Sequence, residues 1–331
     1  MIKTDNGMAL RVHYNTDITD EKISKIKSIW QSAENSVVSE NGIDDISQKS
    51  WKEYIDIDSW AKKYLIEEVF GNSDGGSISQ YFYYDGTKIF AGPVWDYDRT
   101  LGNRVAKQIH SPETFFTNRL EVNENYSAPL FHYLYKKEDF YSEIVKIFKN
   151  EFLPRVSDLC ENKIYEYANK IETASQMNDL RWHGKIYVFN DEINYIIDYL
   201  NKRMDFLCDL YINNKEFCTV KTDFGSGINY AYYAVGIGEK LKDLPEMNDG
   251  KDYLFKGWYY KETNEPFDIN KPITEDIEIY AKWEESQQNR FGDVMKLLPI
   301  AVIAVLFVGL GIFEFKRSRN GGGGVWQKKR K

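Results

Sequence analysis

Cysteine and histidine are scarce in this chain of 331 residues, which contains three cysteines and four histidines. Cys160, Cys208 and Cys218 include no CxxC pair, and an odd number excludes an even disulfide framework, so we expect buried free thiols. The histidines are scattered and lack the ligand spacing typical of zinc sites. Net positive charge is missing too. A net charge of −8 argues against a nucleic-acid partner, because such binding depends on a basic surface.

Long apolar runs are nearly absent. Met1 to Leu10 lacks the apolar segment of a signal peptide. A later uncharged run, Leu297 to Phe313, approaches the roughly 20 residues that a membrane-spanning helix needs. Lysine and arginine gather after this run, so the positive-inside rule places the C-terminus in the cytoplasm and the preceding domains outside the cell. We therefore predict a single-pass cell-membrane protein with these parts: a linker at 285–293, a transmembrane helix at 294–315 and a basic cytoplasmic tail at 316–331.

The remaining sequence has the composition of folded domains. It is 42% hydrophobic and 28% charged over the full chain, which is enough apolar material for a sizeable core. The length favours two domains, and the sequence pattern changes near residue 216. We predict a mostly helical domain at 1–215 and a small β-domain at 217–284, so the fold class is α+β.

Two helices are predicted early in the first domain. One begins at about Thr19. The next begins with Asp58 or Ser59 as its N-cap, since either side chain can accept from the first backbone N–H groups. Gly71 fits a left-handed C-terminal cap of that helix. The second helix carries an apolar stripe: Trp60, Ala61, Tyr64, Leu65 and Val69.

A largely helical region is predicted from Pro129 to about Ile212. Its last helix places Arg203 near an exposed end. The Arg181-Trp182 dipeptide falls between two of these helices. A stacking brace is the simpler interpretation of this dipeptide, and a role in a site is the alternative.

A β-hairpin is predicted after the loop that follows Gly71. Ile78 to Tyr84 is rich in β-branched and aromatic residues, and Lys88 to Ala91 follows across an Asp85-Gly86 turn. Asp-Gly between such runs is typical of a type I′ hairpin turn. A two-residue loop places Tyr84 opposite Thr87.

Three aspartates meet if this register continues to the open end of the hairpin. Asp74 then lies opposite Tyr97, with Asp96 and Asp98 diagonally beside it. Like charges within a few ångströms repel, and a bound cation relieves the repulsion. Oxygen-only ligands suit Mg²⁺ or Ca²⁺. The competing interpretation is a polar turn around Asp74 and a helix cap at Asp96 and Asp98.

Several motifs around these aspartates resemble one family. The motifs are Asp56-Ile-Asp58-Ser59, Asn72-x-Asp74, Phe82-Tyr83-Tyr84, Gly92-Pro93-Val94-Trp95-Asp96-Tyr97-Asp98 and Leu101-Gly102-Asn103. They resemble the CotH (spore coat protein H) kinase family over about Lys3 to Ile212, and the run from Gly92 to Asp98 is the most specific part.

The resemblance implies a protein-kinase-like C-terminal lobe, mostly helical with a catalytic β-hairpin, that transfers phosphate from Mg²⁺-ATP to a protein hydroxyl. By this resemblance Asp74 is the catalytic residue, and Asp96 and Asp98 are the metal residues, Asp98 as a second ligand or a partner of one. Asn72, Asn103 and Arg181 are possible supporting residues. This layout agrees with phosphoryl transfer, in which one aspartate orients the acceptor and another holds metal.

The chain departs from the family at its start. No glycine-rich strand pair, and no strand lysine with a glutamate partner, precedes Asp74. Kinases use these parts to hold the triphosphate. The resemblance therefore predicts an N-terminally truncated kinase that lacks part of the nucleotide clamp, which puts its activity as given in doubt. No HRDxxxxN-type spacing follows Asp74, so the second metal ligand is unassigned.

The predicted β-domain resembles the Listeria–Bacteroides surface repeat (the internalin B-repeat), a β-grasp-like module of cell-surface proteins. Phe255, Gly257, Trp258 and the closing Ala281-x-Trp283 carry the resemblance.

Two functions follow from different classes. The first is a membrane-anchored extracellular kinase acting on a protein outside the cell. The alternative is a cell-surface binding or adhesion protein in which the aspartates hold a structural Ca²⁺.

Overall fold

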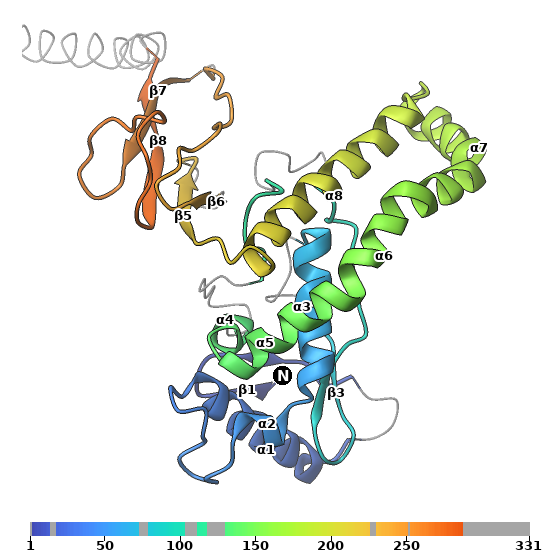
Figure 1. The fold of residues 1–331 in the computed structure, drawn as a ribbon, viewed down its shortest axis with the longest axis vertical. Helices are drawn as coiled ribbons and strands as arrows, with labels where there is room; N and C mark the ends of the chain where they lie inside the picture. Colours follow the sequence, from blue (N-terminus) through green and yellow to red (C-terminus); the bar gives the residue numbers. More distant parts are fainter. Residues whose placement is uncertain are drawn as a thin grey trace, which may run out of the picture. The chain divides into compact units, whose positions relative to one another are not determined.

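The computed structural model describes these parts of the chain: 2–13, 18–72, 79–102, 111–117, 130–225, 230–250 and 252–286. Their helices and strands are, in chain order (Figure 1), β1 (Ile2–Lys3), β2 (Ala9–Leu10), α1 (Asp20–Val38), α2 (Trp51–Tyr54), α3 (Ile57–Phe70), β3 (Phe82–Tyr84), β4 (Ile89–Ala91), α4 (Leu130–Tyr135), α5 (Glu138–Ile147), the π-helical turn η2 (Phe148–Phe152), α6 (Leu153–Asp158), the π-helical turn η3 (Leu159–Lys163), α7 (Ile164–His183), α8 (Phe189–Tyr211), β5 (Phe217–Asp223), β6 (Tyr230–Gly236), β7 (Tyr253–Tyr260) and β8 (Ile277–Glu285). The chain forms two compact units: unit 1 is Met1–Leu244 with Asp268–Ile279, and unit 2 is Pro245–Phe267 with Tyr280–Lys331.

Helix α3 is buried on most of its circumference within unit 1. The predicted apolar stripe is confirmed, since every member of it is at most 1% exposed. Trp60 stacks on Phe82 of the hairpin with ring centroids 4.8 Å apart, and Phe131 of α4 lies 5.3 Å away. The Trp60 indole N–H donates to the Ile89 carbonyl at 2.9 Å, so the buried ring has a polar partner. Aromatic packing therefore fixes α3 against the hairpin and the helical region.

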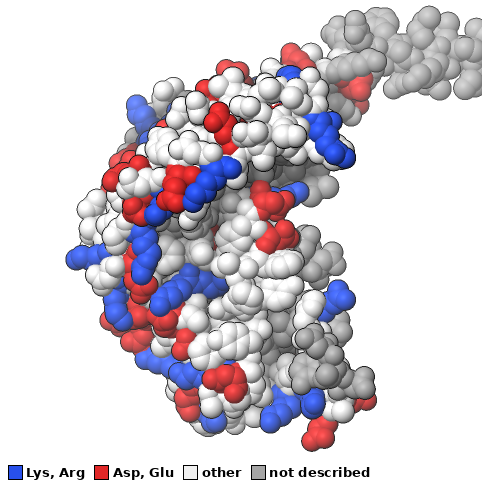
Figure 2. All heavy atoms as spheres, turned by 90° about the vertical axis from the view of Figure 1, so that its right-hand side faces the viewer, with Lys and Arg blue, Asp and Glu red and all other residues white. Residues whose placement is uncertain are grey.

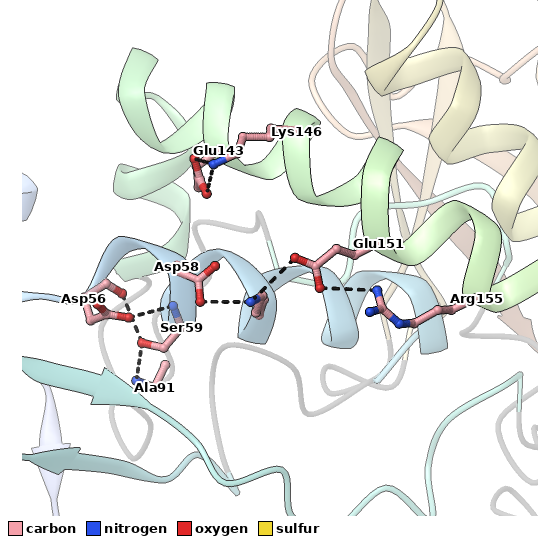
Figure 3. A network of polar contacts seen from close by, with 9 residues as sticks. Asp56, Asp58, Ser59, Ala91, Glu143, Lys146, Glu151 and Arg155 are labelled. Atoms are coloured by element: carbon pink, nitrogen blue, oxygen red, sulfur yellow. Dashed lines mark hydrogen bonds and ion pairs between the residues drawn. The ribbon is translucent and has the colours of Figure 1, made fainter.

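The N-terminus of α3 is fixed by a side-chain cap. Asp56 accepts a hydrogen bond from Ser59 N at 2.9 Å, and Ser59 Oγ accepts one from Ala91 N of β4 at 3.2 Å (Figure 3). Asp56 N also donates to the Ile89 carbonyl at 3.0 Å. The predicted N-cap, Asp58 or Ser59, is therefore wrong. The helix starts earlier because the Asp56 carboxylate reaches the free N–H of its first turn.

An ion-pair ladder follows the exposed side of α3. Lys62 Nζ lies 2.9 Å from Asp58 Oδ2 and 3.6 Å from Glu151 Oε1, and Arg155 Nη1 lies 3.2 Å from Glu151 Oε2 (Figure 3). The ladder joins α3 to η2 and α6. Exposed pairs of this kind contribute little stability, typically about 0–1 kcal/mol.

The hairpin register differs from the predicted one. Tyr84 pairs with Ile89, where a two-residue loop places it opposite Thr87. The cause is the turn: Asp85 Oδ1 accepts hydrogen bonds from Thr87 N at 2.7 Å and Lys88 N at 2.9 Å. These bonds close a four-residue loop. The predicted alignment of Asp74 with Tyr97 assumed the shorter loop, and Asp74 itself lies outside the described residues.

The helical region after residue 129 is confirmed as α4 to α8. Arg203 on α8 is fully buried, so its predicted place near an exposed end is wrong. Burial is possible because Glu68 of α3 faces the guanidinium. The cysteines are free, as predicted; Cys160 and Cys218 are also buried, whereas Cys208 is only half-buried.

Four strands follow α8 in the described residues, and β5 and β6 form an antiparallel pair. In unit 1, β5 pairs with β6 from Phe217↔Gly236 to Asp223↔Tyr230, and the start of β8 lies beside β5. In unit 2, β7 lies beside the rest of β8. Phe255 contacts Trp258 and Trp283 there, with ring centroids 5.9 and 5.3 Å apart. Residues that suggested the surface repeat thus pack together, while the module itself stays a prediction.

The predicted transmembrane helix, and the single-pass membrane location that rested on it, are corrected. Among the residues that the structure describes, no helix is long and apolar enough to cross a membrane. The long helices α1, α7 and α8 carry charged residues throughout, as helices do that pack one face and leave the other in water. Residues 294–315, which carried the prediction, lie outside the described ranges.

Charges of both signs are mixed on the face drawn in Figure 2. Lysine and arginine side chains lie next to aspartate and glutamate side chains in small groups, and no large field of one sign covers this face. A mixed surface does not favour steering of a highly charged partner.

Candidate active site

Two segments of the predicted site meet at the C-terminal end of α3. The helix ends at Gly71 in the left-handed conformation (φ 61°), as predicted, and Asn72 follows it fully buried. Leu101 N, from the segment after the hairpin, donates to the Phe70 carbonyl at 2.7 Å. That carbonyl belongs to the last turn of the helix, where acceptors lack partners within the helix. The segment carrying Asp96 and Asp98 is thus hydrogen-bonded to the point where α3 leads toward Asp74.

A buried polar cluster joins the same two segments. Lys63 Nζ lies 2.6 Å from Glu67 Oε1, with the two side chains 2% and 0% exposed. Glu67 Oε2 accepts from Asn72 Nδ2 at 2.5 Å, and Lys63 Nζ donates to Tyr97 OH at 3.4 Å. Gln80 Nε2 lies 3.4 Å from Glu67 Oε1. One ion pair on α3 therefore contacts residues on both sides of the hairpin.

Tyr97 is the residue between the two predicted metal aspartates. Burial, and after it the negative charge of Glu67, raises the pKa of the Tyr97 phenol well above its ordinary value, while a hydrogen bond from Asn72 lowers it. The phenol is therefore protonated at neutral pH and acts as a hydrogen-bond donor as well as an acceptor.

Asp96 and Asp98 are exposed on either side of Tyr97. Asp96 has φ 64°, and its Oδ2 accepts from Ser79 Oγ at 3.1 Å. Leu101 also has positive φ, 57°. Such conformations cost energy for residues other than glycine and are often found at functional sites, held by their surroundings. The arrangement presents Asp96 outward from a segment anchored by Tyr97.

A second buried ion pair supports the site from the other side of α3. Arg203 Nη2 pairs with Glu68 Oε2, and both side chains are 0% exposed. Arg203 also donates to the backbone carbonyls of Glu68 at 2.6 Å and Pro112 at 2.8 Å, and to that of Thr114. Because Glu67 and Glu68 are adjacent, they point to different sides of the helix, each to its own cation.

Helix α8 also contacts both glycines that flank the site. Tyr195 OH donates to the Gly102 carbonyl. A Cβ at Gly71 would lie 2.2 Å from Tyr199 OH, and one at Gly102 would lie 2.5 Å from Tyr199 Cδ2. Only glycine fits these approaches, and each has positive φ. Tyr195, Tyr199 and Arg203, spaced by four residues, form one face of α8 against the site.

The structure brings together part of the predicted site. Asn72, Asp96 and Asp98 lie on the two joined segments, whereas Asp74 and Asn103 lie outside the described residues. Arg181 is exposed in the last turn of α7, stacked over Trp182 at 5.2 Å. The turn between α7 and α8 lies away from α3 in Figure 1. The supporting role of Arg181 in the site stays a prediction.

Sequence reasoning missed the charged residues under the site: Lys63, Glu67, Glu68 and Arg203. A lysine and a glutamate four residues apart usually indicate an exposed helix face. The signal available in the sequence was the apolar stripe of α3. It lies on both sides of Lys63, Glu67 and Glu68 and leaves little of the helix surface for contact with solvent.

The described part of the chain contains two of the three carboxylates that were predicted to bind metal, Asp96 and Asp98. Within that part, no group of three or more His, Cys, Asp or Glu side chains is placed to hold a metal ion. Asp74, the third predicted carboxylate, lies outside the described residues.

The comparison with known protein families agrees with this fold and site. The family model described as CotH kinase protein matches residues 10–207, which is more than half of the 331 residues. The chain therefore belongs to the CotH kinase protein family. Kinases are transferases, so this family defines the general class of the protein. No curated protein and no solved structure matches the chain.

Proposed function

We propose that this protein is a protein kinase whose site is built at the C-terminal end of α3, and that it transfers the γ-phosphoryl group of ATP to a protein hydroxyl. The supporting observation is the junction of the two segments. The Asn72 segment and the Asp96 to Leu101 segment are both bound to the last turns of α3, through Glu67 and Phe70. Phosphoryl transfer depends mainly on such positioning of charged groups.

Each proposed role follows from the chemistry of transfer. Asp74, two residues beyond Asn72, accepts the proton of the acceptor hydroxyl. The hydroxyl oxygen then forms a bond to the γ-phosphorus as the bond to the ADP oxygen breaks, so ADP leaves with that electron pair. Asn72 fixes the start of the loop by donating to Glu67. Asp96 and Asp98 supply the negative charge that a cation next to the phosphates requires.

The residues present are chemically suited to Mg²⁺. Asp96 and Asp98 offer exposed carboxylate oxygens, and Ser79 Oγ already bonds to one of them. In proteins, Mg²⁺ is usually bound by one or two carboxylates together with phosphate groups of the substrate. Mg²⁺ bound there would neutralise charge on the transferred phosphate.

The test is a thermal-shift series on the full chain with Mg²⁺ alone, Mg²⁺-ATP and Ca²⁺. A ligand that binds only the folded state stabilises it by about 2.7 kcal/mol at a hundredfold excess over Kd. We expect Mg²⁺-ATP to raise Tm, the Asp96→Asn variant to lose the shift, and Asp45→Asn, at an exposed aspartate outside the site, to keep it. Transfer of radiolabelled phosphate to a generic protein acceptor, with Asp74→Ala as the inactive control, follows.

Two results would contradict the proposal. Stabilisation by Ca²⁺ with no nucleotide effect would favour the alternative, a binding protein with a structural Ca²⁺ site. A nucleotide shift that survives Asp96→Asn would place the nucleotide elsewhere.

The region 217–284 is proposed to be a Listeria–Bacteroides repeat module that presents the kinase. The contacts of Phe255 with Trp258 and Trp283 support this proposal.

A further inference from the structure

Stability does not explain the Lys63–Glu67 pair. Both side chains are almost fully removed from water, with Nζ and Oε1 2.6 Å apart. Removing two ions from water costs more than their attraction generally returns, and apolar residues of similar volume are often as stable or more so. A buried pair of this kind therefore suggests a function that requires its geometry.

The contacts of the pair point to that function. Tyr97 OH lies 3.4 Å from Lys63 Nζ, and the ammonium is 5.4 Å from the ring centroid. Glu67 and Asn72 also influence the Tyr97 phenol, and Glu67 Oε2 accepts from Asn72 Nδ2 at 2.5 Å. Its neighbours Asp96 and Asp98 project to solvent from the same short stretch. The backbone at Asp96 has φ 64°, a conformation that needs external support.

We propose that Lys63 and Glu67 are positioning residues for the cation site at Asp96. They hold the Tyr97 side chain under the segment and so fix the direction in which the Asp96 carboxylate is presented. This inference rests on the proposed function, because it assumes that Asp96 binds a divalent cation. Groups that orient metal ligands in this way typically change metal affinity by about 10–100-fold when they are removed.

The test uses the full chain and Mn²⁺ as the probe, because free Mn²⁺ is measured directly by electron paramagnetic resonance without any kinase assay. Single replacement of Lys63 or Glu67 leaves the other charge buried and unpaired, so these variants can unfold. The informative variant is the double replacement Lys63→Met with Glu67→Gln. It leaves no buried charge unpaired, and the amide oxygen introduced by Glu67→Gln can still accept from Asn72.

We expect the double variant to fold, with Tm close to that of the parent, and to bind Mn²⁺ about 10–100-fold more weakly. Tyr97→Phe keeps the ring and loses the hydroxyl contacts, so it should also weaken binding. The matched control is Lys62→Met with Asp58→Asn, an exposed pair with the same spacing on the same helix, 2.9 Å apart. It should leave Mn²⁺ affinity unchanged.

The outcomes separate this inference from the proposed function. If the parent chain shows no Mn²⁺ binding that Asp96→Asn abolishes, the cation site itself is refuted, and the positioning role with it. If the parent binds Mn²⁺ through Asp96 and the folded double variant binds it equally well, the positioning role alone is refuted.

Discussion

Truncation of Arg203 should destabilise the protein far more than truncation of its neighbour on α8. Arg203→Ala removes the partner of Glu68 Oε2 and the donor to the backbone carbonyls of Glu68, Pro112 and Thr114, all in a fully buried setting. The Glu68 carboxylate keeps two backbone donors, Phe116 N at 3.0 Å and Thr117 N at 2.5 Å from Oε1. Its charge is then buried without a cation.

The magnitude follows from that unpaired charge. Removing one partner of a buried ion pair costs about 3–5 kcal/mol. A domain of about 200 residues loses roughly 2–4 °C of Tm per kcal/mol, so the expected decrease is about 6–20 °C. Lys202→Ala is the matched control, since Lys202 is 56% exposed and pairs with Asp198 at 2.7 Å across one turn. Its cost should be about 0–0.5 kcal/mol.

The assay is thermal unfolding followed by far-ultraviolet circular dichroism. The double variant Arg203→Met with Glu68→Gln should lose less free energy of unfolding than the sum of the two single changes. The reason is that the double variant contains no unpaired buried charge at this site. A decrease for Arg203→Ala no larger than that for Lys202→Ala would refute the reasoning that this pair anchors α8 to α3.

Two further predictions concern backbone and pH. Gly71→Ala should lower the free energy of unfolding more than Gly86→Ala, as measured by urea unfolding. Both glycines have positive φ, so alanine at either position costs about 1–2 kcal/mol of strain, but a Cβ at Gly71 also meets Tyr199 OH at 2.2 Å, whereas one at Gly86 has no atom within 4 Å. Adding Tyr199→Phe to Gly71→Ala should recover part of the loss. Burial raises the pKa of Glu34, although hydrogen bonds from Thr4 and Asn6 lower it. The protonated Glu34 side chain therefore contributes stability at low pH, and this contribution is lost as pH rises through the folded-state pKa. Glu34→Gln should therefore gain Tm over the parent as pH increases above about 4.5, and a constant or shrinking difference would contradict this.

Local chemistry predicted much of the helical framework. Thr19 is the N-cap of α1, and Gly71 ends α3 in the left-handed conformation, as expected from residue type alone. These features depend on one or two side chains and the adjacent backbone, so neighbouring residues determine them. The cluster of Asp74, Asp96 and Asp98 was also predicted from the sequence and stays a prediction, although all three residues fall within the family match over residues 10–207.

The hairpin register could not be read from local preference. Asp85-Gly86 favours a two-residue turn, but the Asp85 carboxylate binds Thr87 N and Lys88 N and makes the loop longer. Two loop lengths differ by little energy in isolation, so these side-chain hydrogen bonds decide between them.

The sequence by itself determined where the helices of unit 1 lie, the left-handed end of α3 at Gly71, and which aspartates are candidates for a phosphate-transfer site. Only the tertiary structure decided which charges are buried. Lys63–Glu67 has the spacing of an exposed pair, and Arg203 and Glu68 are 135 residues apart in the chain. Whether such groups face water or each other depends on the helices that cover α3, and that information is not local.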